Sequence, residues 1–124
     1  MEYDKSEMYQ EINRVAAESA AQRDKAAIEY VMGSPHGRWF VSRLLENCHV
    51  NSMLGIVRDD GGMVMDPNAM LVQEGERRVG LMLRNNIAGM SDGLRLLQLM
   101  EVEEKSYNDR QQEIRNTIIA KYEE

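Results

Sequence analysis

Apolar and small residues recur at alternating spacings of four and three along residues 4–32, which predicts one long helix with a narrow seam. Asp4 can cap this helix, Glu7 follows three residues later, and Gly33 comes directly after the last periodic position. The central seam positions are small or polar, so this helix is expected to need a partner helix. The seam consists of Met8, Ile12, Val15, Ser19, Gln22, Ala26 and Tyr30.

A second helix is predicted to begin at Ser34-Pro35, because serine is a good N-cap and proline is favoured at the first helical position. It runs to about Cys48, and its apolar face consists of Trp39, Phe40, Leu44 and Leu45. Helical periodicity is lost over residues 49–67. Two short β-prone runs, 56–58 and 63–65, flank the turn sequence Asp59-Asp60-Gly61-Gly62 there, which predicts a small hairpin.

Asp66-Pro67 repeats the cap-and-proline signal and predicts a third helix over roughly residues 67–87. Gly75 and Gly80 lie inside it at a cost of roughly 1 kcal/mol each relative to alanine, which suggests close packing at both positions. Ser91 is expected to cap a fourth helix over about 92–122. The first half of that helix is apolar almost all round, and the second half keeps only a sparse apolar stripe.

These elements predict a mainly α protein, a bundle of about four helices with long N- and C-terminal helices and a short β-hairpin or loop near 54–66. We expect an N-terminal arm (1–32), a compact core (33–102) and a C-terminal extension (103–124). In that core the apolar face of the second helix is predicted to pack on Val79, Leu81, Met82 and Leu83. The expected contacts between copies lie on the arms, at Ile12, Val15, Tyr107, Ile114, Ile118 and Tyr122.

Composition narrows the function classes. The 124 residues carry a formal net charge of −6 and include ten methionines and one cysteine. Tight binding to nucleic acid is not expected of an acidic chain that has no long run of Lys or Arg. No apolar run approaches the roughly 20 residues that cross a bilayer. Methionine excess is typical of cores or interfaces that adapt to irregular partner surfaces.

The chemically reactive residues are too scattered to form a site. His36 lies about twelve residues from Cys48 and His49, or roughly 18 Å along one helix, so these three cannot share a metal ion. Asp59, Asp60 and Asp66 lack the spacing of a calcium loop and are ordinary turn residues. We therefore expect no catalytic group, no cofactor and no metal.

Arg38 is the charged residue for which a specific role is expected. A bidentate pair with Glu74 or Glu76 on the third helix would fix how the two helices cross. The alternative is that Arg77, Arg78 or Arg84, together with Arg38 and Arg43, contacts DNA or an acidic partner. The residues predicted to form the structural core and its motifs are Pro35, Gly37, Arg38, Trp39, Phe40, Leu44, Leu45, Glu74, Gly75, Arg77, Val79 and Gly80.

Two ordered blocks carry a resemblance to a known family. The first is Ser-Pro-x-Gly-Arg-Trp at 34–39, followed by Leu-Leu-Glu-x-Cys-x-Val at 44–50, and the second is Glu-Gly-x-Arg-x-Val-Gly-Leu at 74–81. Over about residues 33–88 the chain resembles small podophage proteins from the head and morphogenesis region, of the Bordetella-podophage type. The resemblance implies a bacteriophage protein of the virion or of its assembly, with no enzymatic activity.

The expected function is that of a non-enzymatic virion protein that is made in the host cytoplasm and acts as a homo-oligomer. Its expected place is inside the head near the portal and tail, among proteins that are ejected with the genome. A DNA-packaging accessory, similar to a small terminase oligomer, or a morphogenesis factor is the alternative. Membrane contact is expected only during genome delivery, because the arms lack the basic polar face of interfacial helices.

Overall fold

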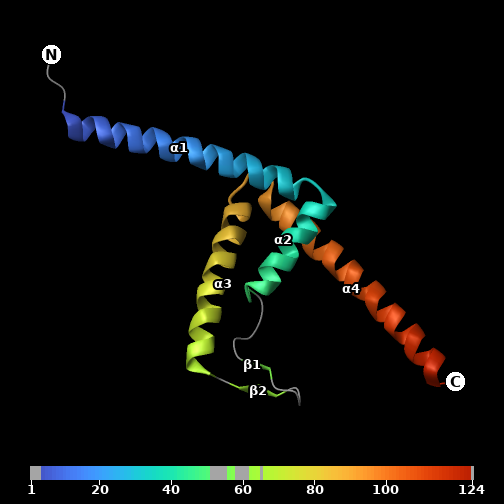
Figure 1. Cartoon of the computed structure of the whole chain (residues 1–124). Helices are drawn as coiled ribbons and strands as arrows, with labels where there is room; N and C mark the ends of the chain where they lie inside the picture. Colours follow the sequence, from blue (N-terminus) through green and yellow to red (C-terminus); the bar gives the residue numbers. More distant parts are fainter. Residues whose placement is uncertain (1–3, 51–55, 58–61, 65, 124) are drawn as a thin grey trace.

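The computed structural model describes residues 4–50, 56–57, 62–64 and 66–123. Within these ranges the chain forms four helices, α1 (Lys5–Met32), α2 (Pro35–Asn47), α3 (Pro67–Ala88) and α4 (Gly93–Glu123). Figure 1 shows that the helices meet at one junction, from which α1 and α4 project in different directions. The mainly α class that the sequence predicts is confirmed.

Three of the four predicted helix starts carry the predicted cap. The Asp4 carboxylate accepts from the Ser6 amide at 2.8 Å, and the Ser34 hydroxyl accepts from the Gly37 amide at 3.1 Å. The Asp66 carboxylate accepts from the Asn68 amide at 2.9 Å. The fourth prediction is off by one residue, because α4 begins at Gly93 and is preceded by Asp92 rather than Ser91.

Two very short strands lie between α2 and α3. β1 (Ile56–Val57) and β2 (Met63–Val64) pair antiparallel, with Ile56 opposite Val64. The predicted turn residues Asp59, Asp60 and Gly61 lie outside the described residues.

The C-terminus of α2 closes in a Schellman motif. The His49 amide donates to the Glu46 carbonyl at 3.0 Å, and the Val50 amide donates to the Leu45 carbonyl at 3.2 Å. His49 adopts a φ of 59°, the left-handed conformation that glycine usually supplies at this position. Val50 and Leu45 are both buried, as expected for the apolar contact that accompanies this motif. The motif therefore turns the chain out of α2 and anchors Val50 in the core.

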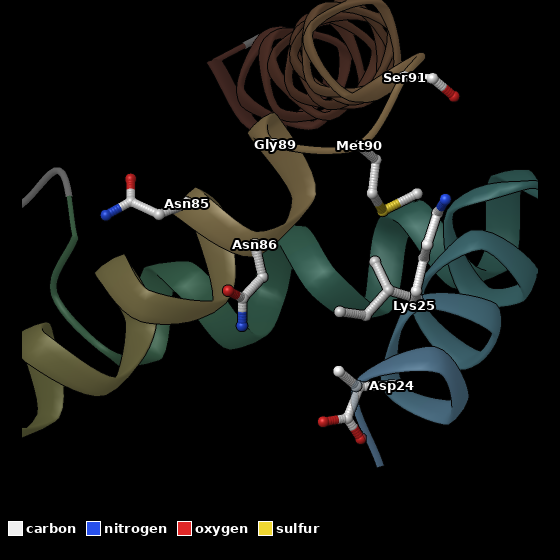
Figure 2. Close-up of a pocket in the computed structure, with 9 residues that line it drawn as sticks. Asp24, Lys25, Asn85, Asn86, Gly89, Met90 and Ser91 are labelled. Atoms are coloured by element: carbon white, nitrogen blue, oxygen red, sulfur yellow. The ribbon is translucent and has the colours of Figure 1, made fainter. Parts of the chain in front are cut away.

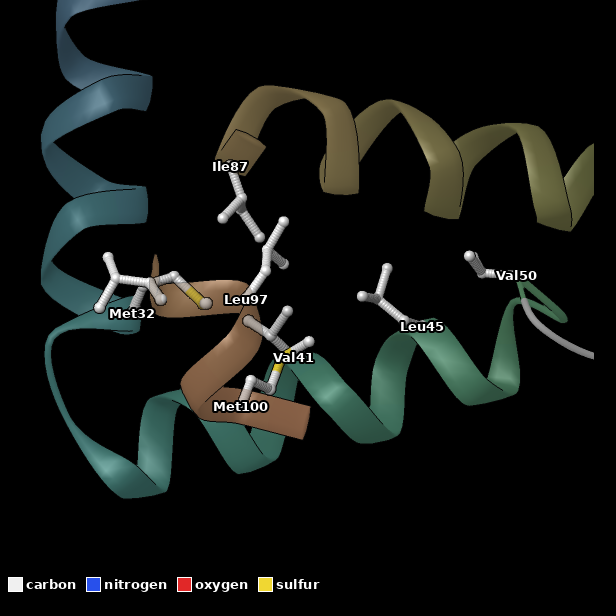
Figure 3. Packing of buried hydrophobic residues seen from close by; sticks show 8 residues of the cluster. Met32, Val41, Leu45, Val50, Ile87, Leu97 and Met100 are labelled. Atoms are coloured by element: carbon white, nitrogen blue, oxygen red, sulfur yellow. The ribbon is translucent and has the colours of Figure 1, made fainter. Parts of the chain in front are cut away.

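One apolar cluster holds the helices together (Figure 3). Met32 and Ile87 are completely buried, so the last residue of α1 and the last turn of α3 reach its centre. The remaining members come from α2, from the start of α4 and from Val50, and the full cluster is Met32, Val41, Leu45, Val50, Ile87, Leu96, Leu97 and Met100. The core is thus confined to the junction.

The predicted packing of α2 on α3 is mostly wrong. Phe40 is 64% exposed and Val79 is 59% exposed, and Leu44 and Met82 are exposed as well. Of the residues proposed for this contact, Leu45 enters the core, while Leu81 and Leu83 border it. The reason is that the apolar first half of α4 covers the face of α2 that carries Val41 and Leu45. Phe40 and Leu44 instead line an apolar groove of about 230 Å³ between α1, α2 and α3.

Both long helices extend from the core as single, solvent-exposed helices. Along α1, every residue from 5 to 27 except Met8 is exposed, and along α4 every residue from 105 to 123 is exposed. Figure 1 shows α1 leaving the junction on one side and α4 leaving on another. The division into two arms and a core with boundaries at 32 and 102 stays a prediction. Among the described residues, no helix is apolar enough over 18 residues to cross a membrane.

Candidate functional site

The centre of the junction is an arginine that joins three helices. The Arg38 guanidinium donates to Glu103 of α4 through two bonds, from Nε to Oε1 at 2.5 Å and from Nη2 to Oε2 at 3.2 Å. Its third nitrogen, Nη1, donates to the Met32 carbonyl at 2.9 Å. Because Met32 is the last residue of α1, one buried side chain fixes the end of α1 and the side of α4 relative to α2. We call this arrangement the Arg38 brace.

The brace depends on a close approach between α1 and α2. A Cβ placed on Gly37 would collide with the backbone carbonyl of Val31 in the last turn of α1. Glycine at this position therefore lets the two helices meet backbone to backbone. That approach brings the Met32 carbonyl within reach of Arg38.

A second row of contacts extends the brace along α4. The Ser42 hydroxyl donates to Glu104 Oε2 at 2.7 Å. The rings of Trp39 and Tyr107 lie 4.5 Å apart between centroids at an angle of 56°, which is a tilted aromatic contact. The Arg43 guanidinium lies 5.8 Å from the Trp39 ring centroid, within range of a cation–π interaction.

The brace that the sequence predicts exists, but its predicted partner is wrong. Glu74 pairs with Arg78 at 3.7 Å on the surface of α3, and Glu76 contacts His49 Nε2 at 3.1 Å. Arg38 points to α4 because that helix, not α3, covers its side of α2. Glu103 and Glu104 were missed, although they fall in the same helical phase as Met100 and Tyr107 and so interrupt a core-facing stripe with two acids.

The second sequence block supplies a different close approach. A Cβ on Gly80 would lie 2.6 Å from Val50 Cγ2 and 2.7 Å from Cys48 Cβ, so α3 passes tightly over the end of α2. Gly75 differs from this pattern, since a Cβ there meets nothing within 4 Å. The predicted close packing is therefore found at Gly80 and is wrong at Gly75.

The arginines proposed for DNA contact do not form a basic surface among the described residues. Arg38 is buried in the brace, and Arg43 pairs with Glu46 Oε2 at 3.0 Å. Arg78 pairs with Glu74, and Arg84 lines a small cleft together with Glu46, Glu101 and Glu104. Arg77 is half-buried, and its Nε has no hydrogen-bond partner in the described part of the chain. Glutamates thus offset most of this positive charge.

The reactive residues are placed as the sequence spacing requires. His36 is exposed at the start of α2, whereas Cys48 and His49 are half-buried at its far end, and Asp66 caps α3. The described residues contain no group of three His, Cys, Asp or Glu side chains that could hold a metal ion.

A polar cleft of about 420 Å³ opens where α1 leaves the junction. Figure 2 shows Asp24 and Lys25 of α1 across from Asn85 and Asn86 of α3, with Met90 in the connection to α4. Asp24 and Lys25 are exposed, as are Asn85 and Asn86, so their polar groups stay hydrated.

An exposed ion pair lies at the start of α4. Arg95 donates from Nε to the Asp92 carboxylate at 2.9 Å, and a second bond runs from Nη2. The hydrogen bonds from Arg95 hold the pKa of Asp92 below its usual value of 3.8, against an opposing effect of desolvation and with a further lowering by the positive charge of Arg95. The lowered pKa favours the folded state above pH 3.8, and this contribution is lost as the pH falls through the pKa of the folded protein.

The fold and the brace together define a small helical protein with a braced junction and two projecting arms. A family model described as Bbp19-like phage protein matches residues 28–101, and the chain belongs to this family of bacteriophage proteins. The match confirms the family resemblance inferred from the sequence. No curated protein and no solved structure matches the chain.

The limits of the family match follow the architecture. It begins in the last turns of α1 and ends within α4, just before Glu103. It therefore covers both glycine contacts and Arg38, and it leaves out most of both exposed arms. The family-specific part of this chain is the junction.

Proposed function

We propose that this phage protein is a non-enzymatic structural component of the virion that works as a homo-oligomer. The observation that carries the proposal is the pair of arms with exposed apolar stripes. Ile12 is 53% exposed on α1 and Ile118 is 51% exposed on α4, and the same stripes include Val15, Ile114 and Tyr122. Side chains of this kind, repeated along one face of a helix, are typical of a surface that another helix covers.

The total surface supports the same proposal. The chain exposes 10067 Å². A compact folded monomer of 14.3 kDa would expose roughly 6,800 Å² by the usual scaling of surface with mass. Large permanent interfaces bury about 2,000–5,000 Å² or more summed over both partners, so burying even half of this excess of roughly 3,000 Å² on each chain would give an interface of that class. Covering the arms would bring this chain to an ordinary surface area.

The stability of the arms gives a third argument. Most helical stability in proteins comes from packing an apolar face, and the exposed parts of α1 and α4 lack such packing within the chain. The exposed parts of the two helices carry scattered i,i+4 ion pairs, such as Arg14–Glu18 at 3.1 Å. Each pair adds only a few tenths of a kcal/mol to helix stability. Contacts between copies would supply the missing packing.

Sedimentation of the full chain is expected to show an oligomer at micromolar concentration. Ile118→Glu should weaken association at least tenfold, because it places a charge on the apolar stripe of α4. Asn116→Glu is the matched control, since it adds the same charge on the opposite face of the helix. Neither substitution lowers helix propensity, because glutamate is a better helix former than isoleucine or asparagine. A monomer with both arms helical at high micromolar concentration would contradict the proposal.

We place the oligomer inside the phage head, near the portal and tail, with other virion proteins as partners. The acidic charge supports this placement, because an internal protein must not bind tightly to packaged DNA. Mass spectrometry of purified virions is expected to detect the protein, and emptied ghosts are expected to have lost it. Absence from intact virions would contradict the placement and favour a morphogenesis factor.

A further inference from the structure

The apolar stripe of the α4 arm is a direct continuation of the face that α2 covers. Glu103, Glu104 and Tyr107 contact α2 through Arg38, Ser42 and Trp39. Beyond Tyr107 the same helical phase carries Ile114 and Ile118, which are bare. The part of α4 that α2 covers ends here, because α2 begins only at Pro35 and the preceding helix α1 runs in another direction (Figure 1). The face of α4 is therefore covered by α2 up to Tyr107 and is exposed to solvent beyond it.

The orientation of α2 limits what can occupy the bare half. α2 crosses α4 (Figure 1), with Arg38 near its start beside Glu103 and Leu45 near its end in the cluster that contains Leu97 and Met100. If two α4 arms paired in parallel, both α2 helices would lie between them at the level of residues 100–107. An antiparallel pair avoids this collision, because each arm then faces a stretch of the other that α2 leaves free.

We propose that the bare face of the α4 arm, residues 108–123, binds the same face of a second copy in an antiparallel, two-fold symmetric pair. This inference rests on the homo-oligomer proposed above and assigns its contact surface. Opposing Ile114 to the partner's Ile118 places the two-fold axis near residue 116.

The pairing surface fits a second copy better than an unrelated partner. A two-fold axis requires a face that complements itself, and Ile114 and Ile118 are four residues apart, so each fills the space beside the other across the axis. The two Arg115 side chains flank the axis on the solvent side, where both remain hydrated. The proposal leaves the α1 arm free for further contacts.

Electron–electron distance measurement on spin labels tests the orientation. Labels are placed singly at Asp109, Asn116 and Glu123, three exposed positions on the side of α4 away from the stripe, in the full chain carrying Cys48→Ala. Alanine keeps the Cβ that packs near Gly80 and removes the native thiol. The distance between labels in a pair should be shortest at 116. At 109 and 123 the two labels should be about 20 Å apart along the helix axis, since seven residues on each side rise 1.5 Å each.

Each result has a definite meaning when sedimentation of the same labelled samples is measured alongside. A minimum at 116 supports the antiparallel pair. Equal distances at all three positions would show a parallel pair and overturn this inference, while leaving the homo-oligomer intact. Long distances at all three positions in a sample that still associates would place the contact elsewhere and also overturn it. A monomer would overturn both this inference and the proposed function.

Discussion

Arg38→Ala is expected to lower the free energy of unfolding by about 3 kcal/mol. Removing one partner of a buried ion pair typically costs 3–5 kcal/mol, because the other charge is left uncompensated. Glu103 has about a third of its side chain exposed, so water can hydrate part of its charge and the cost falls toward the lower end. The variant also leaves the Met32 carbonyl without the donor that it has in the brace.

Denaturant titration followed by Trp39 fluorescence measures this effect, because the indole lies against Tyr107 in the same contact row. Arg38→Lys should lose roughly half as much stability, since lysine keeps the charge but cannot form the two-pronged pair. Arg14→Ala removes an exposed arginine that is also ion-paired, and it should cost less than 1 kcal/mol. Equal losses for Arg38→Ala and Arg14→Ala would show that the brace is not what holds the junction.

Gly37→Ala is expected to destabilise the protein by about 3 kcal/mol or to prevent the junction from closing. The added methyl group would occupy the position of the Val31 carbonyl, and backbone cannot move aside as the end of a flexible side chain can. Overpacking of this kind typically costs 1–3 kcal/mol, and here the shift would also disturb the Arg38 bond to Met32. Thermal unfolding followed by circular dichroism is the measurement.

The chain offers a matched control in the second block. Gly75→Ala is the same chemical change inside a helix, at a position where the new methyl group meets open space. Helix propensity should then dominate, and the variant should gain up to about 1 kcal/mol. Opposite signs at Gly37 and Gly75 are the expected result, and destabilisation by both changes would mean that close approach is not the reason for Gly37.

The helices were predictable because their signals are local. Asp4, Ser34 and Asp66 each combine a side-chain acceptor with the start of a periodic pattern, and each caps the helix that follows it. The family resemblance was equally readable, since its first block covers α2 with the residues that cap it and its second block lies within α3. These features need no knowledge of how the helices are arranged.

The partner of Arg38 was not predictable by the same reasoning. Glu74 and Glu103 are equally plausible acceptors by chemistry, and the choice between them depends on which helix covers α2. That choice is made by the first half of α4, whose Leu96, Leu97 and Met100 compete with α3 for the same face. The exposure of Phe40 and Val79 is a consequence of that competition, and single-helix periodicity does not encode it.

The Arg38 brace holds one end of the long helix α1, so a small rotation there moves the other end of the helix over a large distance. α1 is 28 residues long, or about 42 Å at 1.5 Å per residue. A tilt of about 10° at Met32 would therefore swing the far end of this helix by roughly 7 Å. If copies associate through the α1 arm as proposed, a small change in side-chain packing at Arg38 would change the spacing between them.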